Sequence, residues 1–259
     1  MIISDHVCEA LTEFGGQVPF DHVVIDDFFT KEWAEKLEAD FPGFDDPVWH
    51  QYKNPIEVKK VCNLWNVFPK DTYMALNWLN SVEFLSLLSE HLAIPGLSSD
   101  PGLNGGGWHA HKRGGKLNTH LDYSIHPKLG MQRKINLIVY LNSAWEDSWG
   151  GHLGLWHQRS DAKAPGALAK EVAPRFNRAV LFDTTQDSWH GLPAPLACPE
   201  NQSRRSLAVY YLVPAPEGVD RRGKALFAPT EEQEGDAEIL ELIKARSNVE
   251  TAAKVYTDQ

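Results

Sequence analysis

The stretch Leu117-Asn118-Thr119-His120-Leu121-Asp122 points to both the fold and the chemistry of this chain. Its residue types, like those of several runs after it, favour a short strand bounded by turn residues. Successive side chains of a strand point to opposite faces, so His120 and Asp122, two positions apart, share one face. An imidazole and a carboxylate on one face can hold a single ion. The stretch therefore predicts a strand and part of a metal site.

Similar runs lie on both sides of this stretch, between residues 108 and 213. Each is rich in β-branched or aromatic residues and is separated from the next by turn residues. Besides Leu117–Asp122, they are Trp108–Lys112, Ile135–Leu141, Leu153–His157, Ala179–Phe182 and Leu207–Val213. Several short strands at this spacing predict a sandwich or barrel, whose mouth can gather ligands from separate strands.

The first part of the chain combines one strand with helices. Val23–Ile25 is expected to be a short strand, and Thr30 to cap a helix that Pro42 stops. A second helical pattern runs over Met74–Leu88, and the composition of Pro95–Gly107 predicts a loop. These helices are expected to support a sheet.

The last part of the chain becomes charged after Pro214, and its apolar residues predict a terminal helix over Glu232–Arg246. The length of 259 residues is compatible with one domain. The expected organisation is a single domain 1–259, with a strand and supporting helices in 1–107, the strand-rich core in 108–214 and an extension with a helix in 215–259.

Composition excludes several classes of function. The net charge is -10 and no long basic tract is present, so neither nucleic acid nor a membrane surface is expected as a partner. The three cysteines have no paired spacing, which argues against a disulfide framework and a thiolate metal site. The first residues lack the pattern of a secretion signal, and no apolar run approaches a membrane span. We expect a cytoplasmic protein, and the oligomeric state is not predicted.

Residues far downstream complete the metal pattern of the His-x-Asp triplet. His190 supplies a second imidazole, and two imidazoles with one carboxylate on one side of a metal are the arrangement of non-heme Fe(II) oxygenases. The pair Arg204-Arg205 follows. An arginine there suggests a dicarboxylate co-substrate, because the guanidinium fork matches a carboxylate with two parallel hydrogen bonds.

The ordered set of motifs resembles the prolyl-4-hydroxylase-like branch of the 2-oxoglutarate and Fe(II)-dependent dioxygenase superfamily. The triplet alone is a weak signal, whereas the set in order is a strong one. It covers roughly the central half of the chain and comprises Arg113–Leu117, His120–Asp122, Ile135–Asn142, Trp149–Leu153, Trp189–Gly191 and Arg204–Tyr211. The resemblance implies a mainly β fold with supporting helices, whose core is a double-stranded β-helix or jelly roll.

The resemblance also implies the roles of individual residues. The implied ligands of Fe(II) are His120, Asp122 and His190. The implied contacts to the far carboxylate of 2-oxoglutarate are Arg204, Ser206 and Tyr140. Strand alternation puts Arg204 and Ser206 on one face, so Arg205 is the alternative. Relatives often have a tyrosine on the strand before the triplet, and this chain offers His109 or His111 there.

The implied activity is that of a dioxygenase, most simply a hydroxylase. Fe(II), 2-oxoglutarate and O2 would hydroxylate an unactivated C–H, with succinate and CO2 as co-products, and ascorbate is left open as a further cofactor. The substrate is either a protein residue of the prolyl type or a small metabolite. Related halogenases have a small residue in place of the metal carboxylate, so Asp122 argues against halogenation.

Two other functions fit part of the pattern. One is a non-catalytic jelly-roll protein that binds a ligand and keeps a structural metal. The other is a zinc-dependent hydrolase, since zinc also accepts two histidines and a carboxylate. Neither needs a dicarboxylate clamp, so the Arg-Arg-Ser motif favours the oxygenase.

Some motif residues also have structural interpretations. A buried Arg-x-Ser motif could form an ion pair with Asp183 or Asp187, although the motif order favours co-substrate binding. Basic residues near the triplet, among them Arg133, could attract an anion or form a solvated strand edge. Residues Trp49–Lys60 could form a lid, with a surface loop as the default.

Overall fold

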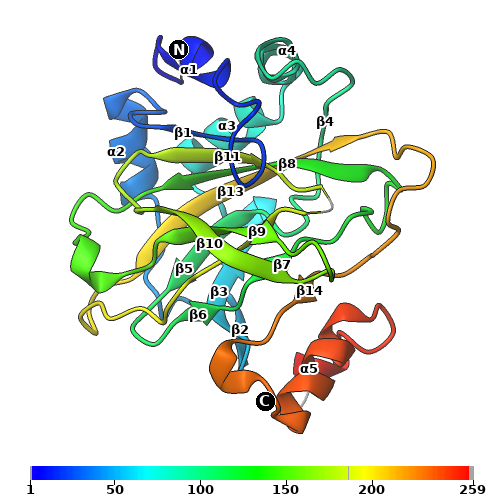
Figure 1. Ribbon diagram of the computed structural model, residues 1–259. Coiled ribbons are helices and arrows are strands. Elements are labelled where there is room, and N and C mark those ends of the chain that lie inside the picture. Colours follow the sequence, from blue (N-terminus) through cyan, green and yellow to red (C-terminus); the bar gives the residue numbers. More distant parts are fainter. Residues whose placement is uncertain (1, 186, 257–259) are drawn as a thin grey trace.

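The computed structural model describes residues 2–185 and 187–256 (Figure 1). Two antiparallel sheets face each other and form its centre. The amino-terminal helices, blue to cyan in Figure 1, lie on one side of the larger sheet, and the last helix, in red, lies at the opposite end of the molecule. No described helix is both long and apolar enough to span a bilayer.

The larger sheet contains nine strands of the described chain. Seven follow the order β1-β11-β8-β13-β5-β3-β2, while β4 pairs with β13 and β6 pairs with β3. Their bounds are β1 His22–Ile25, β2 His50–Asn54, β3 Glu57–Cys62, β4 Ser98–Ser99, β5 Gly107–His111, β6 Lys116–Leu117, β8 Gln132–Tyr140, β11 Ala179–Asp183 and β13 Arg204–Val213.

The smaller sheet has the strand order β10-β9-β12-β7-β14. Its strands are β7 His120–Leu121, β9 Leu153–Gln158, β10 Pro165–Val172, β12 Trp189–Gly191 and β14 Leu226–Phe227. Between the sheets lies a small apolar core that includes Leu155 of β9 together with Val180 and Phe182 of β11. This core holds the two sheets face to face, as in a double-stranded β-helix.

Helices cover the outer face of the larger sheet. They are α1 Val7–Leu11, α2 Lys31–Ala39, α3 Lys70–Leu79 and α4 Val82–His91, while α5 Ala237–Ser247 lies at the other end. Four short 3-10 turns occupy Trp65–Val67, Asp147–Trp149, Glu231–Gln233 and Lys254–Tyr256. Alternate residues of β13, namely Leu207, Val209 and Tyr211, pack with the helices in the largest apolar core. The side chains of the intervening residues of β13 therefore point into the space between the sheets.

The helical expectations hold with two refinements. Thr30 is the N-cap of α2, but its side chain makes no capping hydrogen bond. The second helical pattern divides into α3 and α4, because Ser81 starts a new helix by accepting a hydrogen bond from Phe84 N at 3.3 Å. The expected terminal helix over Glu232–Arg246 is α5, which starts after Asp236 caps it.

Two expectations about strands were wrong, and one strand was missed. Leu117–Asp122 is not one strand, because Leu117 ends β6 in the larger sheet and His120 starts β7 in the smaller one. The segment Trp49–Lys60 is not a loop, because it contains β2 and most of β3, which pair as a hairpin. The edge strand β10 was not predicted, because most of its side chains are exposed and charged or small.

Candidate metal centre and its cavity

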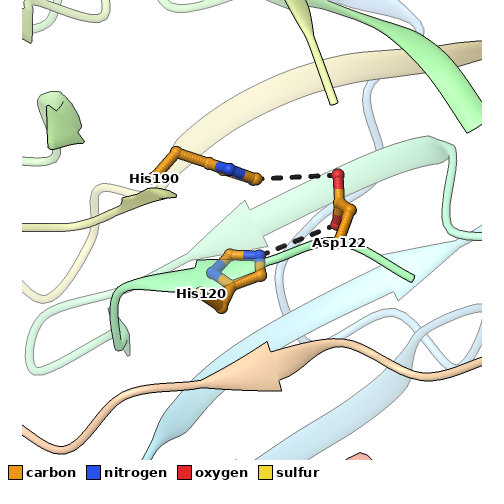
Figure 2. A group of neighbouring side chains, drawn as sticks. All are labelled: His120, Asp122 and His190. Carbon is orange, nitrogen blue, oxygen red and sulfur yellow. Dashed lines mark ion pairs between the residues drawn. The ribbon is translucent and has the colours of Figure 1, made fainter. Parts of the chain in front are cut away.

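Two histidines and one aspartate converge between the sheets (Figure 2). His120 of β7 lies directly opposite His190 of β12 in the antiparallel pairing, and Asp122 follows β7. His120 Nε2 is 3.8 Å from Asp122 Oδ1, and His190 Nε2 is 3.7 Å from Asp122 Oδ2. All three residues are buried. Because metal–ligand bonds are about 2.0–2.2 Å long, atoms at these separations can bind one ion.

The backbone fixes the orientation of both imidazole rings. His120 Nδ1 lies 3.0 Å from Asn118 O, and His190 Nδ1 lies 2.8 Å from Ser188 O. A carbonyl only accepts, so Nδ1 carries the hydrogen and the Nε2 lone pair is available. Burial lowers the pKa of both rings, that of His120 to about 3. Both are therefore neutral at pH 7, as metal ligands must be.

Asp122 is ionised although it is buried. Burial by itself would raise the pKa of its carboxyl group, but the charges around it, that of Arg133 first, outweigh this effect and lower the pKa to about 2. Its Oδ2 atom is buried and has no hydrogen-bond partner. An unsatisfied carboxylate oxygen beside two imidazole lone pairs fits a divalent cation.

Arg133, one of the basic residues near the triplet, contacts the candidate metal group directly. Its Nη1 atom is 3.4 Å from Asp122 Oδ1, and its Nη2 atom donates to Asn104 O at 2.5 Å. The guanidinium lies between the rings of Tyr123 and Tyr210, at 3.5 and 3.4 Å from their centroids. This stacking fixes its position and holds its charge against the metal-site carboxylate.

A β-bulge directs Arg133 into the site. In the β8–β13 pairing Ile135 is opposite Tyr211, yet Arg133 is opposite Leu212, so Lys134 is an extra residue. Strict alternation would put Arg133 on the helix-covered face with Ile135, whereas the bulge puts it on the face of Tyr210. No sequence pattern marked this shift.

The inner face of the larger sheet gathers the proposed co-substrate residues. Ser206 of β13 is paired with Tyr140 of β8, and the Arg204 guanidinium lies 4.7 Å from the centre of the Tyr140 ring. Arg204 Nε donates to Gly151 O at 2.7 Å. Gly151 has φ +77°, and a Cβ there would lie 2.8 Å from Arg204 Cδ, so the glycine makes room for the arginine. All three proposed residues are buried.

The two adjacent arginines point to opposite sides of the sheet. Arg204 lines the cavity, whereas the Arg205 guanidinium lies 5.6 Å from the ring of Phe41, in the helix-covered core layer. Among the described residues no carboxylate forms an ion pair with Arg204. Asp183, one of the two acids considered as its partner, pairs instead with Lys134.

His109 and His111 of β5 face the same space. His109 pairs with Ser206 and His111 with Arg204 across the β5–β13 register. His109 Nε2 is 3.1 Å from Gly105 O. His111 is 3 % exposed, and neither of its ring nitrogens has a hydrogen-bond partner. Burial lowers the pKa of His111, so its ring is neutral and can both donate and accept.

The metal group, Arg204 and Ser206 line one cavity of about 240 Å³ between the sheets, together with His109 and His111. Tyr140 is not among the residues that line it and packs in the apolar core beside Leu153. Segments outside the strand-rich core also contribute to its wall, Tyr52 and Lys59 from the β2–β3 hairpin and Lys224 and Phe227 from the C-terminal part. Phe227 is stacked on His120, with centroids 5.0 Å apart and planes inclined by 20°. None of these wall residues was predicted as a site residue from the sequence, apart from the possible lid over Trp49–Lys60.

The sequence comparison identifies a family for the middle of the chain. Residues 106–212 match the model of the 2OG-Fe(II) oxygenase superfamily. This segment contains the His120–Asp122–His190 group and Arg204. No curated protein matches the chain.

Two solved structures resemble the whole arrangement. One is a prolyl-4-hydroxylase from Pseudomonas putida, which is 15% identical, with 81% of this chain and 100% of that chain covered and a TM-score of 0.56. The other is a prolyl hydroxylase from Trichoplax adhaerens in complex with a hypoxia inducible factor peptide fragment, which is 15% identical, with 80% and 89% covered and a TM-score of 0.53. The expected jelly-roll fold is confirmed, and at these identities the likeness concerns the fold alone.

Proposed function

Residues 106–212 match the 2OG-Fe(II) oxygenase superfamily, and from this premise we propose that His120, Asp122 and His190 hold Fe(II). The observation that carries the proposal is the convergence of one ionised carboxylate and two neutral imidazoles. Both imidazoles have Nε2 lone pairs that hydrogen bonds at Nδ1 leave available. Two histidines and a carboxylate on one side of the ion leave the remaining positions open for co-substrates.

Arg204, Ser206 and Tyr140 are the proposed binding residues for 2-oxoglutarate. Arg204 is a buried guanidinium without a carboxylate partner among the described residues, and its Nε is held by Gly151 O. Its remaining N–H groups can therefore donate to the far carboxylate of the co-substrate. Arg205 is assigned no role in this site, because it lies over Phe41 on the other side of the sheet.

The chain contributes orientation and a dry, shaped cavity. When bound, Fe(II) with 2-oxoglutarate and O2 supplies the oxidising power for C–H hydroxylation and yields succinate and CO2. Arg133 holds the Asp122 carboxylate ionised and in place, and the two backbone carbonyls hold the imidazole rings. The stacked Phe227 ring shields His120 from water on the C-terminal side. A role for ascorbate stays open.

The substrate is proposed to be small where it enters the site. A cavity of about 240 Å³ is below the roughly 300–1,000 Å³ typical of pockets for drug-sized ligands, and it must hold 2-oxoglutarate as well. It therefore accepts a small metabolite or one side chain, such as a prolyl ring.

We also propose a single domain and a cytoplasmic location for this protein. A single domain is supported because strands from 1–107 and β14 from 215–259 pair with strands of the core. A cytoplasmic location is supported by the three free cysteines, which suit a reducing compartment that also keeps iron ferrous.

A zinc hydrolase and a non-catalytic binding protein remain the competing functions. Neither explains a buried guanidinium without a carboxylate partner, which is costly unless a ligand supplies the anion. Arg204 therefore favours the oxygenase over both.

The test is an anaerobic titration with Fe(II) and 2-oxoglutarate, followed by visible absorption and then by succinate release in air. We expect a weak charge-transfer band that needs both additions. Asp122→Ala and His190→Ala should lose bound iron and turnover but keep a cooperative melt, because an open catalytic site contributes less to folding than a closed one. His157→Ala, at an exposed position of β9, is the matched control. Absence of the band in the wild-type protein, or full activity in both variants, would contradict the proposal.

A further inference from the structure

Polar side chains form a row across the larger sheet and extend beyond the proposed 2-oxoglutarate contacts. Arg204 of β13 pairs with His111 of β5, and Tyr52 of β2 pairs with Lys59 of β3. In the β3–β5 register Val61 is opposite His109 and Lys60 opposite Ala110, so one further step puts Lys59 beside His111. Since neighbouring strands are about 4.8 Å apart, Lys59 is roughly 10 Å from Arg204 along this row.

Lys59 directs its charge into the cavity. Its side chain is only 15% exposed, and its Nζ lies 3.3 Å from Glu57 Oε2 and 5.2 Å from the centre of the Tyr52 ring. The Lys59 charge contributes, after burial, to lowering the pKa of His111, and it acts in the same direction on His190. Lys59 therefore shares the cavity with His111 and the metal centre.

Cationic groups on the cavity wall exceed the carboxylates available to them. Lys59, Arg133, Arg204, Lys224 and Arg246 line the cavity together with the single carboxylate of Asp122. Glu57, fully buried behind the wall, contacts both Lys59 and Arg246. Bound Fe(II) and 2-oxoglutarate would bring equal and opposite charges, so the cationic excess persists in the loaded site.

Two groups on this side have unused binding capacity. Lys224 forms no ion pair with any carboxylate of the described residues, although it lines the cavity. Both ring nitrogens of the buried His111 lack a partner. A buried polar group without a partner is unfavourable, so His111 points to a ligand with oxygen atoms. Lys224, which is half-buried on the same cavity wall, adds a positive charge that favours an anionic one.

We propose that the substrate of this site is a small anionic molecule whose carboxylate or phosphate group binds Lys59 and His111, with Lys224 at the rim. This inference deepens the proposed function and rests on it, because substrate and co-substrate share one cavity. Arg204 holds one anion, the far carboxylate of 2-oxoglutarate, and Lys59 holds a second one about two strands away. The metal centre lies across the cavity from this row, so the anchored anion fixes which C–H of the substrate faces it.

The experiment is calorimetric titration of the protein saturated with Mn(II) and 2-oxoglutarate, at constant ionic strength. Mn(II) replaces Fe(II) so that no turnover occurs, and bound 2-oxoglutarate keeps Arg204 occupied. The probes are propionate, inorganic phosphate and neutral propionamide. We expect saturable binding of one of the two anions and none of propionamide. Whether propionate or phosphate binds identifies the anionic group.

Variants locate the subsite. Lys59→Met should weaken binding of the anion roughly 10- to 100-fold, the loss of one charge-assisted hydrogen bond, and Lys59→Arg should restore most of it. Lys31→Met, on an exposed turn of α2, is the control and should bind like the wild type. A thermal melt of each variant verifies folding, and Lys224→Met provides a second test at the rim.

The results distinguish failure of the anion subsite from failure of the proposed function. Absence of saturable anion binding, equal binding of propionamide, or unchanged affinity in both Lys59→Met and Lys224→Met would overturn the proposal. Failure of the proposed function itself appears earlier and separately, as an absence of Mn(II) or 2-oxoglutarate binding before any probe is added.

Discussion

Replacement of Arg204 by methionine tests the co-substrate site most directly. The side chain is 4% exposed, its Nε is fixed on Gly151 O, and its other N–H groups face the cavity without a carboxylate partner. Removal of one partner of a buried charge pair costs about 3–5 kcal/mol. At 1.36 kcal/mol for each factor of ten, 2-oxoglutarate affinity should fall roughly 150- to 5,000-fold. Mn(II) affinity should hardly change, because the Arg204 side chain contacts Gly151 O and the Tyr140 ring rather than the proposed metal ligands.

The thermal stability of the ligand-free protein should not fall when Arg204 is replaced by methionine. Burial lowers the pKa of Arg204, which means that the folded protein bears the cost of a desolvated cation. Methionine of similar length removes this cost, so the melting temperature without ligands should stay the same or rise. A variant that lost affinity merely by misfolding would melt earlier.

Arg205→Met is the matched control, since Arg205 is the next residue in the chain and its side chain lies over Phe41, outside the cavity. Calorimetric titration of 2-oxoglutarate into Mn(II)-loaded protein measures the co-substrate affinity of the wild type, Arg204→Met and Arg205→Met. Arg204→Lys should be intermediate, because an ammonium lacks the planar fork that binds a carboxylate with two bonds. Equal losses at the two positions, or a larger loss at Arg205, would refute the face assignment of β13.

Three further predictions concern the surrounding groups. Arg133→Met leaves the metal-site carboxylate without its main counter-charge, so the apoprotein should lose about 3–5 kcal/mol in urea unfolding and recover part of it with Mn(II); equal stability with wild type would contradict this. Gly151→Ala places a Cβ 2.8 Å from Arg204 Cδ at φ +77°, so 2-oxoglutarate affinity should fall more than Mn(II) affinity in the same titration. Burial lowers the pKa of His120 to about 3 and that of His111 well below 6.5. As pH falls below 6.5, these two histidines therefore become protonated in the unfolded chain before they do so in the folded protein. Apoprotein stability should then decrease by up to about 1.4 kcal/mol per histidine and pH unit, and equal urea midpoints at pH 7 and 5.5 would show otherwise.

Strand periodicity is the part of the site that sequence could predict. The two-residue repeat placed Arg204 and Ser206 on one face and Arg205 on the other, and the β13 pairings put both predicted residues between the sheets. This inference works because β13 is a long strand, buried on both faces, in which alternation is unbroken up to Tyr211.

Interruptions of that repeat are what sequence could not predict. His120 and Asp122 were placed together by alternation within one strand over Leu117–Asp122, yet the chain passes from the larger to the smaller sheet before His120, and β7 ends at Leu121. The bulge that turns Arg133 inward depends on how β8 aligns with β13, a distant strand. Such register is a tertiary property, and a local pattern carries no record of it.

The residues proposed for the reaction and those proposed for substrate selection lie in different parts of this chain. The metal group and Arg204 lie within residues 106–212, the segment that matches the superfamily. Lys59 comes from the β2–β3 hairpin before that segment, and Lys224 and Phe227 come after it. A common core can keep the reaction constant while flanking segments set the charge and size of what reaches the metal. The substrate of this enzyme should therefore depend on the hairpin and the C-terminal segment, so Lys59→Met should change anion binding while leaving 2-oxoglutarate affinity within a few-fold of the wild type.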